Sequence, residues 1–288
     1  MDFRNAKELL KVCQEQNLSI SAVMLQRELT EGEQDPEETD RKMDRVLEIM
    51  KSAASTPIHT PVKSMGGLIG GEAKKISDHK DTGKGLCGDL LERAVIYAMA
   101  TLETNASMGV IVASPTAGSA GIVPGLLLAL QETYDLSDEQ IKQGLYNASA
   151  IGYLAMRNAT VAGAVGGCQA EVGIASAMAA SATVELMGGS PEQSLAAAST
   201  VLMNMLGLVC DPVGLVEYPC QNRNAAGVAN ATIAAEIALS GVRQLIPFDE
   251  MLEAVYTVGK RLPAELRETA LGGCATTPSA CAACHMCD

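Results

Sequence analysis

Apolar residues recur with a helical period through the first part of the chain. The segments AKELLKVCQEQ, ISAVMLQREL and EETDRKMDRVLEIM each carry apolar side chains three or four positions apart, with charged side chains between them. Asp35 and Pro36 precede the third segment, and a proline near the first turn is typical of a helix start. The pattern predicts an N-terminal layer of amphipathic helices over residues 1–55.

Glycines interrupt this pattern between Thr56 and about Gly85. The segment SMGGLIGGEAKK, residues 64–75, is typical of a glycine-rich loop that leads into a polar segment. Helical patterns return after Gly88, and no run of β-branched residues alternates at period two over a useful length. We expect helices at 88–104, 123–133, 137–157, 172–187, 191–207, 223–241 and 247–258. The sequence therefore predicts an all-α fold, with a single compact multi-helix domain and glycine-rich loops.

One uncharged stretch, residues 105–131, is long enough to cross a bilayer. Pro115, Pro124 and several glycines interrupt it, and its middle reads SPTAGSAG. We interpret it as a loop between two helices, so no membrane association is expected. Loops without charge are expected where a site is buried.

Composition and charge narrow the class of protein. The 288 residues include 48 % hydrophobic and 19 % charged side chains, which suits a packed globule. The formal net charge of −13 repels phosphate backbones, so nucleic-acid binding is not expected. Aromatic residues make up only 3 %, and the many small side chains favour helices that approach each other closely.

Nine cysteines are a high count for this chain. The first residues, MDFRNAKELL, carry no secretory hydrophobic region, so we expect a cytoplasmic protein without a disulfide framework. Cysteines in such a protein favour metal or redox chemistry. Cys13 and Cys87 stand alone in the sequence, and we interpret them as small buried apolar residues.

Three further cysteines lie in unusual local sequences. Cys168 lies in GGCQAEVG, directly before a predicted helix, where the thiol pKa is lowered. Cys210 and Cys220 bracket CDPVGLVEYPC, and its prolines predict a shaped turn. The spacing is not that of a zinc finger, but it suits a three-thiolate site assembled by the fold. Spacing alone supports metal binding and buried thiols equally.

Five segments extend this interpretation. SMGGLIGGEAKK, NASMGVIVASPTAGSAGIVPG, GGCQAEVGIASAMAA, NMLGLVCDPVGLVEYPCQNRNA and RETALGG resemble motifs of the alpha subunit of bacterial iron–sulfur-dependent L-serine dehydratases. The resemblance implies a helical catalytic domain, here at residues 56–275, whose glycine-rich loops lie at the active site. It also implies a [4Fe–4S] cluster on Cys168, Cys210 and Cys220. The loop from 210 to 220 is one residue shorter than usual in that family: it either tightens around Gly214 or moves Cys220 out of reach.

The resemblance also implies a reaction. A cluster held by three cysteines leaves one iron open, and that iron acts as a Lewis acid on the substrate hydroxyl while a general base takes the Cα proton. L-Serine is thereby dehydrated and deaminated to pyruvate and ammonia. Two alternatives stay open: a related cluster-dependent lyase that acts on L-cysteine or another β-substituted amino acid, and a non-catalytic iron–sulfur carrier or sensor.

Candidate substrate-binding residues lie in two loops and beside the third cysteine. In the family the loops SMGG and TAGSAG resemble substrate-pocket loops, which points to Ser64, Thr116 and Ser119. Arg223 and Asn224 follow Cys220 closely, and a guanidinium there could clamp a carboxylate, or lie at a helix surface. We weigh each against a purely structural role.

Glu171 and Asp211 adjoin two of the cysteines, where they could hydrogen-bond to the ligands or cap helices. The general base is not identified, because His59, His79 and His285 lie in no catalytic motif. Two-chain members of the family carry a separate beta subunit with a Ser-His-Thr motif that is absent here. The resemblance therefore implies a heterodimer or larger assembly, in which the partner completes the active site.

The chain ends in a cysteine-rich tail, residues 276–288. Cys281, Cys284 and Cys287 have C-x2-C-x2-C spacing, which occurs in ferredoxin-type cluster sites. Single-chain relatives resemble an arrangement in which a terminal cysteine occupies the open iron, and Cys287 is the candidate. A second metal site and a tail without a defined role are the alternatives.

Overall fold

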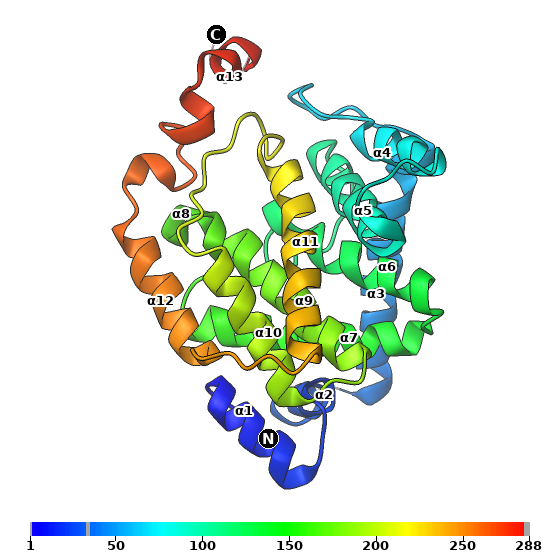
Figure 1. Ribbon diagram of the computed structural model, residues 1–288, viewed down its shortest axis with the longest axis vertical. Helices are drawn as coiled ribbons and strands as arrows, with labels where there is room; N and C mark the ends of the chain where they lie inside the picture. Colours follow the sequence, from blue (N-terminus) through cyan, green and yellow to red (C-terminus); the bar gives the residue numbers. More distant parts are fainter. Residues whose placement is uncertain (1, 33–34, 285–288) are drawn as a thin grey trace.

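Helices form most of the chain in the computed structural model, which describes residues 2–32 and 35–284 (Figure 1). The α-helices are α1 (Ala6–Gln16), α2 (Ile20–Glu31), α3 (Pro36–His59), α4 (Glu72–Asp81), α5 (Gly88–Ala106), α6 (Ile122–Tyr134), α7 (Asp138–Asn158), α8 (Gly163–Gly166), α9 (Ile174–Leu186), α10 (Pro191–Asn204), α11 (Cys220–Leu239), α12 (Phe248–Arg261) and α13 (Pro278–Ala283). Among these residues there is no β-strand, only the isolated bridges Cys210–Arg267 and Val213–Tyr218. The prediction of an all-α fold is confirmed.

Helix α9 lies at the centre of the bundle. Its residues 174–184 are all buried, and most of them are alanine or serine. Helices α6, α7, α10 and α11 pack around it. Small side chains let neighbouring helices approach closely, and buried hydroxyls find partners: Ser181 donates to the Asn147 side chain over 2.6 Å. The core therefore needs few aromatic residues.

The N-terminal helices close one end of the bundle, with the C-terminal α13 at the other (Figure 1). Phe3, Leu9 and Ile20 are fully buried, and the Arg27 guanidinium lies 4.0 Å from the Tyr153 ring centre. Helix α3 continues past residue 55 to pack beside α5. The division into segments 1–55, 56–275 and 276–288 stays a prediction.

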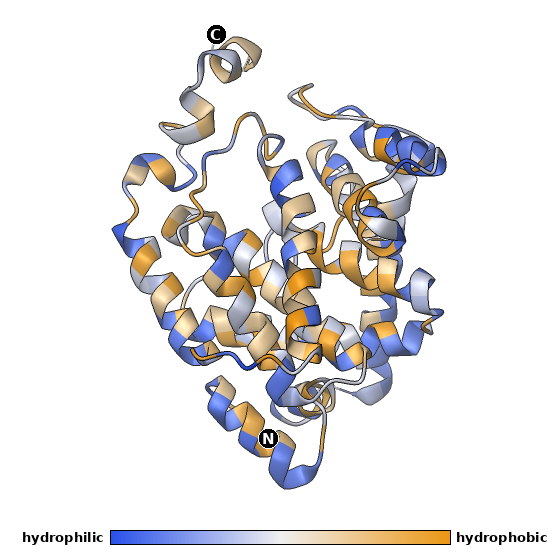
Figure 2. Cartoon of the chain, in the orientation of Figure 1, coloured by the Kyte–Doolittle hydropathy of each residue, from blue (hydrophilic) through white to orange (hydrophobic). Residues whose placement is uncertain are grey.

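Helix α4 corrects one expectation, because the polar segment after the glycine-rich loop is a helix. Figure 2 shows it as almost uniformly hydrophilic, and Ala73 is its one buried residue. A hydrophobic pattern could not reveal it. Its N-terminus is instead stabilised by a tertiary contact, since the Ala73 amide donates to the Glu103 carboxylate of α5 over 2.9 Å.

The uncharged stretch at residues 105–131 contains the predicted loop between two helices. Residues 107–116 follow α5 without regular structure, then a 3-10 turn (η1, Ala117–Ser119) leads into α6. None of the described helices combines the length and hydropathy that crossing a bilayer requires.

Candidate metal and substrate site

The three predicted cysteine ligands are buried at the end of the bundle opposite the N-terminus. Cys168 precedes a π-helical turn (η2, Gln169–Gly173), Cys210 follows α10, and Cys220 is the first residue of α11. Their exposed fractions are 2 %, 3 % and 7 %. The Sγ atoms of Cys168 and Cys210 and a carboxylate oxygen of Glu171 all lie within 4.8 Å of one another, which makes these residues a possible metal-binding group.

Buried amides position Cys168. Gln169 donates from Nε2 to the Val255 carbonyl of α12 over 2.9 Å, and its Oε1 accepts from the Gly207 amide over 2.8 Å. Gly167 has a φ of +74°, a left-handed conformation that glycine adopts without strain. The π-helical turn therefore sits between α12 and the segment after α10, and π-helical turns are frequent at functional sites.

The connection between Cys210 and Cys220 is a closed turn. Cys210 pairs with the segment after α12, because its amide donates to the Leu266 carbonyl over 2.9 Å and its carbonyl accepts from Glu268 over 2.7 Å. Glu217 is fully buried within the turn, and its carboxylate accepts from the amides of Leu68 and Leu215 at 3.3 and 3.2 Å. The shortened connection is thus held at Cys210 and through the Glu217 carboxylate.

Arg223 joins two of these pieces. Its Nη1 lies 2.7 Å from Asp211 Oδ1, and it donates to the Val209 carbonyl over 2.9 Å and to Cys168 Sγ over 3.6 Å. Asp211 is 2 % exposed and accepts from the Cys274 amide over 2.6 Å. A guanidinium therefore faces the thiol of Cys168, and Asp211 orients it. A contact of Arg223 with a substrate carboxylate stays a prediction.

The local environment shifts the pKa values of the three thiols in different directions. A hydrogen bond from Cys210, aided by the Arg223 charge, holds the pKa of Cys168 below its usual value despite burial. The same hydrogen bond, together with burial, raises the pKa of Cys210. Burial and the Cys168 charge raise the pKa of Cys220 to about 12. Of the three thiols, Cys168 is therefore the one whose ionisation the site favours, whereas burial disfavours the thiolate forms of Cys210 and Cys220.

Glu171 connects the cysteines to the TAGSAG loop. Its Oε1 accepts from the Thr116 hydroxyl over 2.8 Å, and its Oε2 lies 3.5 Å from Cys210 Sγ. Burial raises the pKa of this carboxyl, partly offset by the Thr116 hydrogen bond. The Thr116 and Ser119 hydroxyls lie 3.1 Å apart. Thr116 and Ser119, two predicted substrate-binding residues, thus lie beside the possible metal-binding group.

Ser64 and Asn224 have backbone partners. Ser64 Oγ accepts from the Ile69 amide over 3.2 Å and so shapes its own glycine-rich loop. The Asn224 amide accepts from Gly121 at 3.0 Å and donates to the Gly118 carbonyl at 2.8 Å, which ties α11 to the TAGSAG loop. A contact of either residue with a substrate stays a prediction.

Several other residues complete the comparison with the sequence. The side chains of His59 and His79 are exposed, and Cys287 and His285 lie outside the described residues. Cys13 is buried as predicted, but the prediction for Cys87 is wrong, because Cys87 is exposed. Glu217, Glu103 and Gln221 were not singled out by the sequence. Each is buried and polar, but a buried carboxylate cannot be told from a surface one by residue type alone.

The thiol donors suit an iron–sulfur cluster in kind. Each thiolate of a four-iron cluster binds a different iron, so the donors must surround it instead of converging on one point. Cys168 and Cys210 lie close together with Cys220 outside their group. Gly163 leaves room beside them, because a Cβ there would lie 3.1 Å from Cys210 Sγ and 2.3 Å from Glu171 Oε2.

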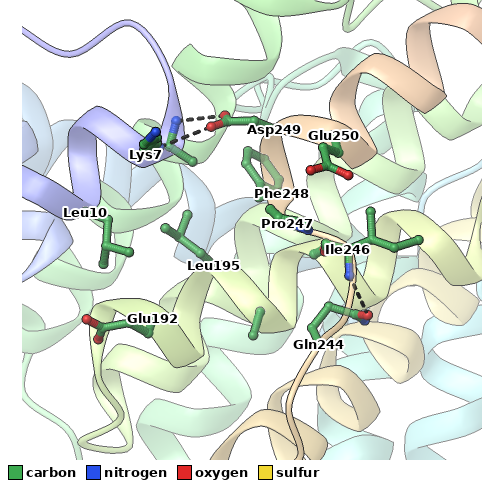
Figure 3. A pocket seen from close by; sticks show the side chains of 13 residues that line it. Lys7, Leu10, Glu192, Leu195, Gln244, Ile246, Pro247, Phe248, Asp249 and Glu250 are labelled. Atoms are coloured by element: carbon green, nitrogen blue, oxygen red, sulfur yellow. Dashed lines mark hydrogen bonds between the residues drawn. The ribbon is translucent and has the colours of Figure 1, made fainter.

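A cavity of about 500 Å³ opens elsewhere, between α1, α10 and the start of α12 (Figure 3). Leu10, Leu195 and Phe248 form part of its apolar wall, and Asp249 beside it accepts from the Lys7 amide of α1 over 3.1 Å. None of the predicted site residues that the structure describes lines it. It carries no part of the cysteine chemistry.

Comparison with known proteins agrees with the motifs. Residues 15–275 match the family model described as serine dehydratase alpha chain. The chain is 49 % identical to the probable L-serine dehydratase alpha chain of Bacillus subtilis, over 96 % of this chain and 92 % of that one. It is 46 % identical to the L-serine dehydratase alpha chain of Peptoniphilus asaccharolyticus, over 95 % and 94 %. It is 34 % identical to L-serine dehydratase 2 of Escherichia coli, over 97 % of this chain and 62 % of that one. The chain therefore belongs to the serine dehydratase alpha chain family.

Proposed function

We propose that this chain is the catalytic alpha chain of an iron–sulfur L-serine dehydratase, which converts L-serine to pyruvate and ammonia. One observation carries the proposal: the possible metal-binding group of Cys168, Glu171 and Cys210 lies beside Arg223, the TAGSAG loop and the buried Cys220. The names of the related alpha chains identify the reaction to test.

Cys168, Cys210 and Cys220 would hold the [4Fe–4S] cluster, with Cys287 of the tail as a candidate resting ligand. When bound, the cluster supplies an open, Lewis-acidic iron for the substrate hydroxyl. The third thiol is the less certain donor by sequence, since its loop is short, but the turn through Glu217 keeps Cys220 buried at the first residue of α11.

The other side chains would bind and orient the substrate. Arg223 offers a cation to the substrate carboxylate from the α11 side, while Asp211 keeps the guanidinium in place. Thr116 and Ser119 offer hydroxyls from the opposite loop, and Ser64 and Asn224 shape the loops around them. Burial raises the pKa of Glu171 and so disfavours a negative charge beside the cysteines.

A second chain would complete the site. The described residues near the cysteines include no histidine to serve as the base for the Cα proton, and L-serine dehydratase 2 of Escherichia coli extends well beyond the matched region. We expect a beta chain to supply the base, in a heterodimer or larger assembly. A cytoplasmic location stays a prediction.

The decisive experiment uses anaerobically reconstituted alpha and beta chains together. L-Serine and L-cysteine are offered separately, and pyruvate, ammonia and sulfide are measured. Pyruvate from serine without sulfide from cysteine supports serine as the substrate, and the reverse result identifies a cysteine lyase. Cys168→Ala should abolish the serine reaction, whereas Cys13→Ala, a buried thiol outside the site, should retain it.

The carrier or sensor alternative draws on the exposed tail, where Cys281 is exposed and Cys284 is partly buried. Deletion of residues 281–288 separates the two functions. Iron content that survives the deletion but is lost in Cys168→Ala supports the core site. Iron that disappears with the tail alone supports the carrier.

A further inference from the structure

Glu103 is a fully buried carboxyl near the end of α5, outside the group of cysteines. Its Oε1 accepts from the Ala73 amide at the start of α4 over 2.9 Å and from Gln221 Nε2 over 3.2 Å. Gln221 also donates to the Met99 carbonyl over 3.3 Å. One carboxyl group thus joins α4, α5 and α11, three helices that are distant in the sequence.

The two ends of this network adjoin predicted site residues. Gln221 directly follows Cys220 in the first turn of α11. Ala73 lies in the first turn of α4, which follows the glycine-rich loop that contains Ser64. The loop itself packs against the turn before Cys220, because a Cβ on Gly66 would lie 2.2 Å from Glu217 Oε2. A displacement of Gln221 or of Ala73 would therefore change the packing at both Cys220 and the loop that contains Ser64.

We propose that Glu103 is a positioning residue, which fixes the first turn of α11, with Cys220, relative to the loop of residues 64–71. The catalytic consequence rests on the proposed function, but the positioning does not. Without Glu103, the α4 amide and the Gln221 side chain lose their common acceptor, and the α11 turn is free to shift against the loop. Cys220 is then no longer held at the distance that a shared cluster requires.

Burying a carboxyl at this position costs free energy unless several hydrogen-bond donors stabilise it. Its burial raises the pKa of Glu103, opposed by the hydrogen bonds from Ala73 and Gly71. A glutamine offers the same acceptor oxygen without a titrating proton. Glu103→Gln should therefore preserve the network, and Glu103→Ala should break it.

The molecule contains a matched control. Glu185 of α9 accepts from the Ser21 amide at the start of α2 over 3.3 Å and from Asn147 Nδ2 over 2.7 Å. This partly buried carboxylate therefore joins α2 and α7 to α9, as Glu103 joins α4 and α11 to α5, away from Cys168, Cys210 and Cys220. Glu185→Ala removes an equivalent network without touching the site.

The first test needs no cluster. Metal-free wild type, Glu103→Ala, Glu103→Gln and Glu185→Ala are treated with iodoacetamide, and alkylation is mapped by mass spectrometry as the rate at Cys220 divided by the rate at Cys168. We expect this ratio to rise about tenfold in Glu103→Ala, the effect of losing one buried hydrogen-bonded group. Glu103→Gln and Glu185→Ala should stay within about twofold of wild type.

Cluster loading provides the second readout. Iron and acid-labile sulfide per chain should fall by more than half in Glu103→Ala and remain near wild type in Glu103→Gln and Glu185→Ala. If Glu103→Ala does not fold, Gln221→Ala removes one arm of the network and should raise the alkylation ratio in the same direction. An unchanged ratio in Glu103→Ala or Gln221→Ala, or an equal rise in Glu185→Ala, overturns the proposal. Because alkylation is measured without activity, failure of the serine reaction would not affect this result.

Discussion

The ion pair of Asp211 and Arg223 should be the most sensitive point of the site. Asp211 is 2 % exposed, the Arg223 side chain is 16 % exposed, and their closest atoms are 2.7 Å apart. Asp211→Ala leaves a guanidinium without its partner, which costs about 3–5 kcal/mol in buried pairs. Asp211→Asn keeps an acceptor for the Cys274 amide but loses the charge, which costs about 1.5–3 kcal/mol.

These free energies convert to melting temperatures. At roughly 2 °C per kcal/mol for a chain of this size, Tm should fall by about 6–10 °C in Asp211→Ala and by about 3–6 °C in Asp211→Asn. The measurement is thermal unfolding of metal-free, reduced protein by circular dichroism. Arg223→Met combined with Asp211→Asn removes both charges and should recover stability relative to Asp211→Asn alone.

The dependence on pH tests the cause. Against the effect of burial, hydrogen bonds from Cys274 and the Arg223 guanidinium hold the pKa of Asp211 below its usual value. A carboxyl with a lowered pKa contributes stability above its unfolded pKa of about 3.9, and this stability is lost as the pH falls through the folded pKa. The Tm difference between wild type and Asp211→Asn should be complete at pH 7 and shrink below about pH 4. Equal melting temperatures at pH 7, or a difference independent of pH, would refute the reasoning.

Three further predictions concern neighbouring residues. Gly163→Ala places a methyl group in the space of the metal-binding group, so iron content after reconstitution should fall by more than half, whereas Gly173→Ala meets only an ordinary contact at 3.7 Å and should load normally. Glu217→Ala leaves two loop amides without their acceptor and should lower the free energy of unfolding by about 1–3 kcal/mol in urea titrations. Because the pKa of Glu103 is raised, wild type should lose stability relative to Glu103→Gln as the pH rises above about 4.3, and a constant difference between pH 4 and pH 8 would contradict that cause.

The helices of the core were predictable because their side chains show the period of the helix. The predicted helix at 137–157 is α7 within one residue at each end, since Ser137 and Gln140 form a capping box that defines the start. α4 was missed because it lacks an apolar face, and its support comes from Glu103, thirty residues further along the chain. A hydrophobic pattern reveals a helix with an apolar face, but it does not reveal a helix that is stabilised by a distant side chain.

The site was predictable in kind but not in detail. The family motifs pointed to the three cysteines and to the TAGSAG loop, and the position after Cys220 pointed to Arg223. The structure brings Cys168, Cys210 and Arg223 together. For Asp211 the sequence left two roles open, a partner of the site or a helix cap. It is the partner of Arg223, because the turn after Cys210 points its carboxylate at α11. That orientation depends on pairing with residues 266–268, which no local pattern reveals.

Proton release should accompany cluster loading, because the fold raises the pKa of two of the three cysteine thiols. The hydrogen bond with Cys168 and burial raise the pKa of Cys210, and burial raises the pKa of Cys220 and of Glu171. Arg223 is the cation that lies beside Cys168. Thiols must lose their protons to bind iron, so loading is opposed by each proton that the fold retains. Iron and acid-labile sulfide per chain, measured after anaerobic reconstitution, should therefore increase between pH 6.5 and pH 8.5. Loading that is independent of pH over this range would mean that the thiols are already ionised, and the electrostatic picture of the site would be wrong.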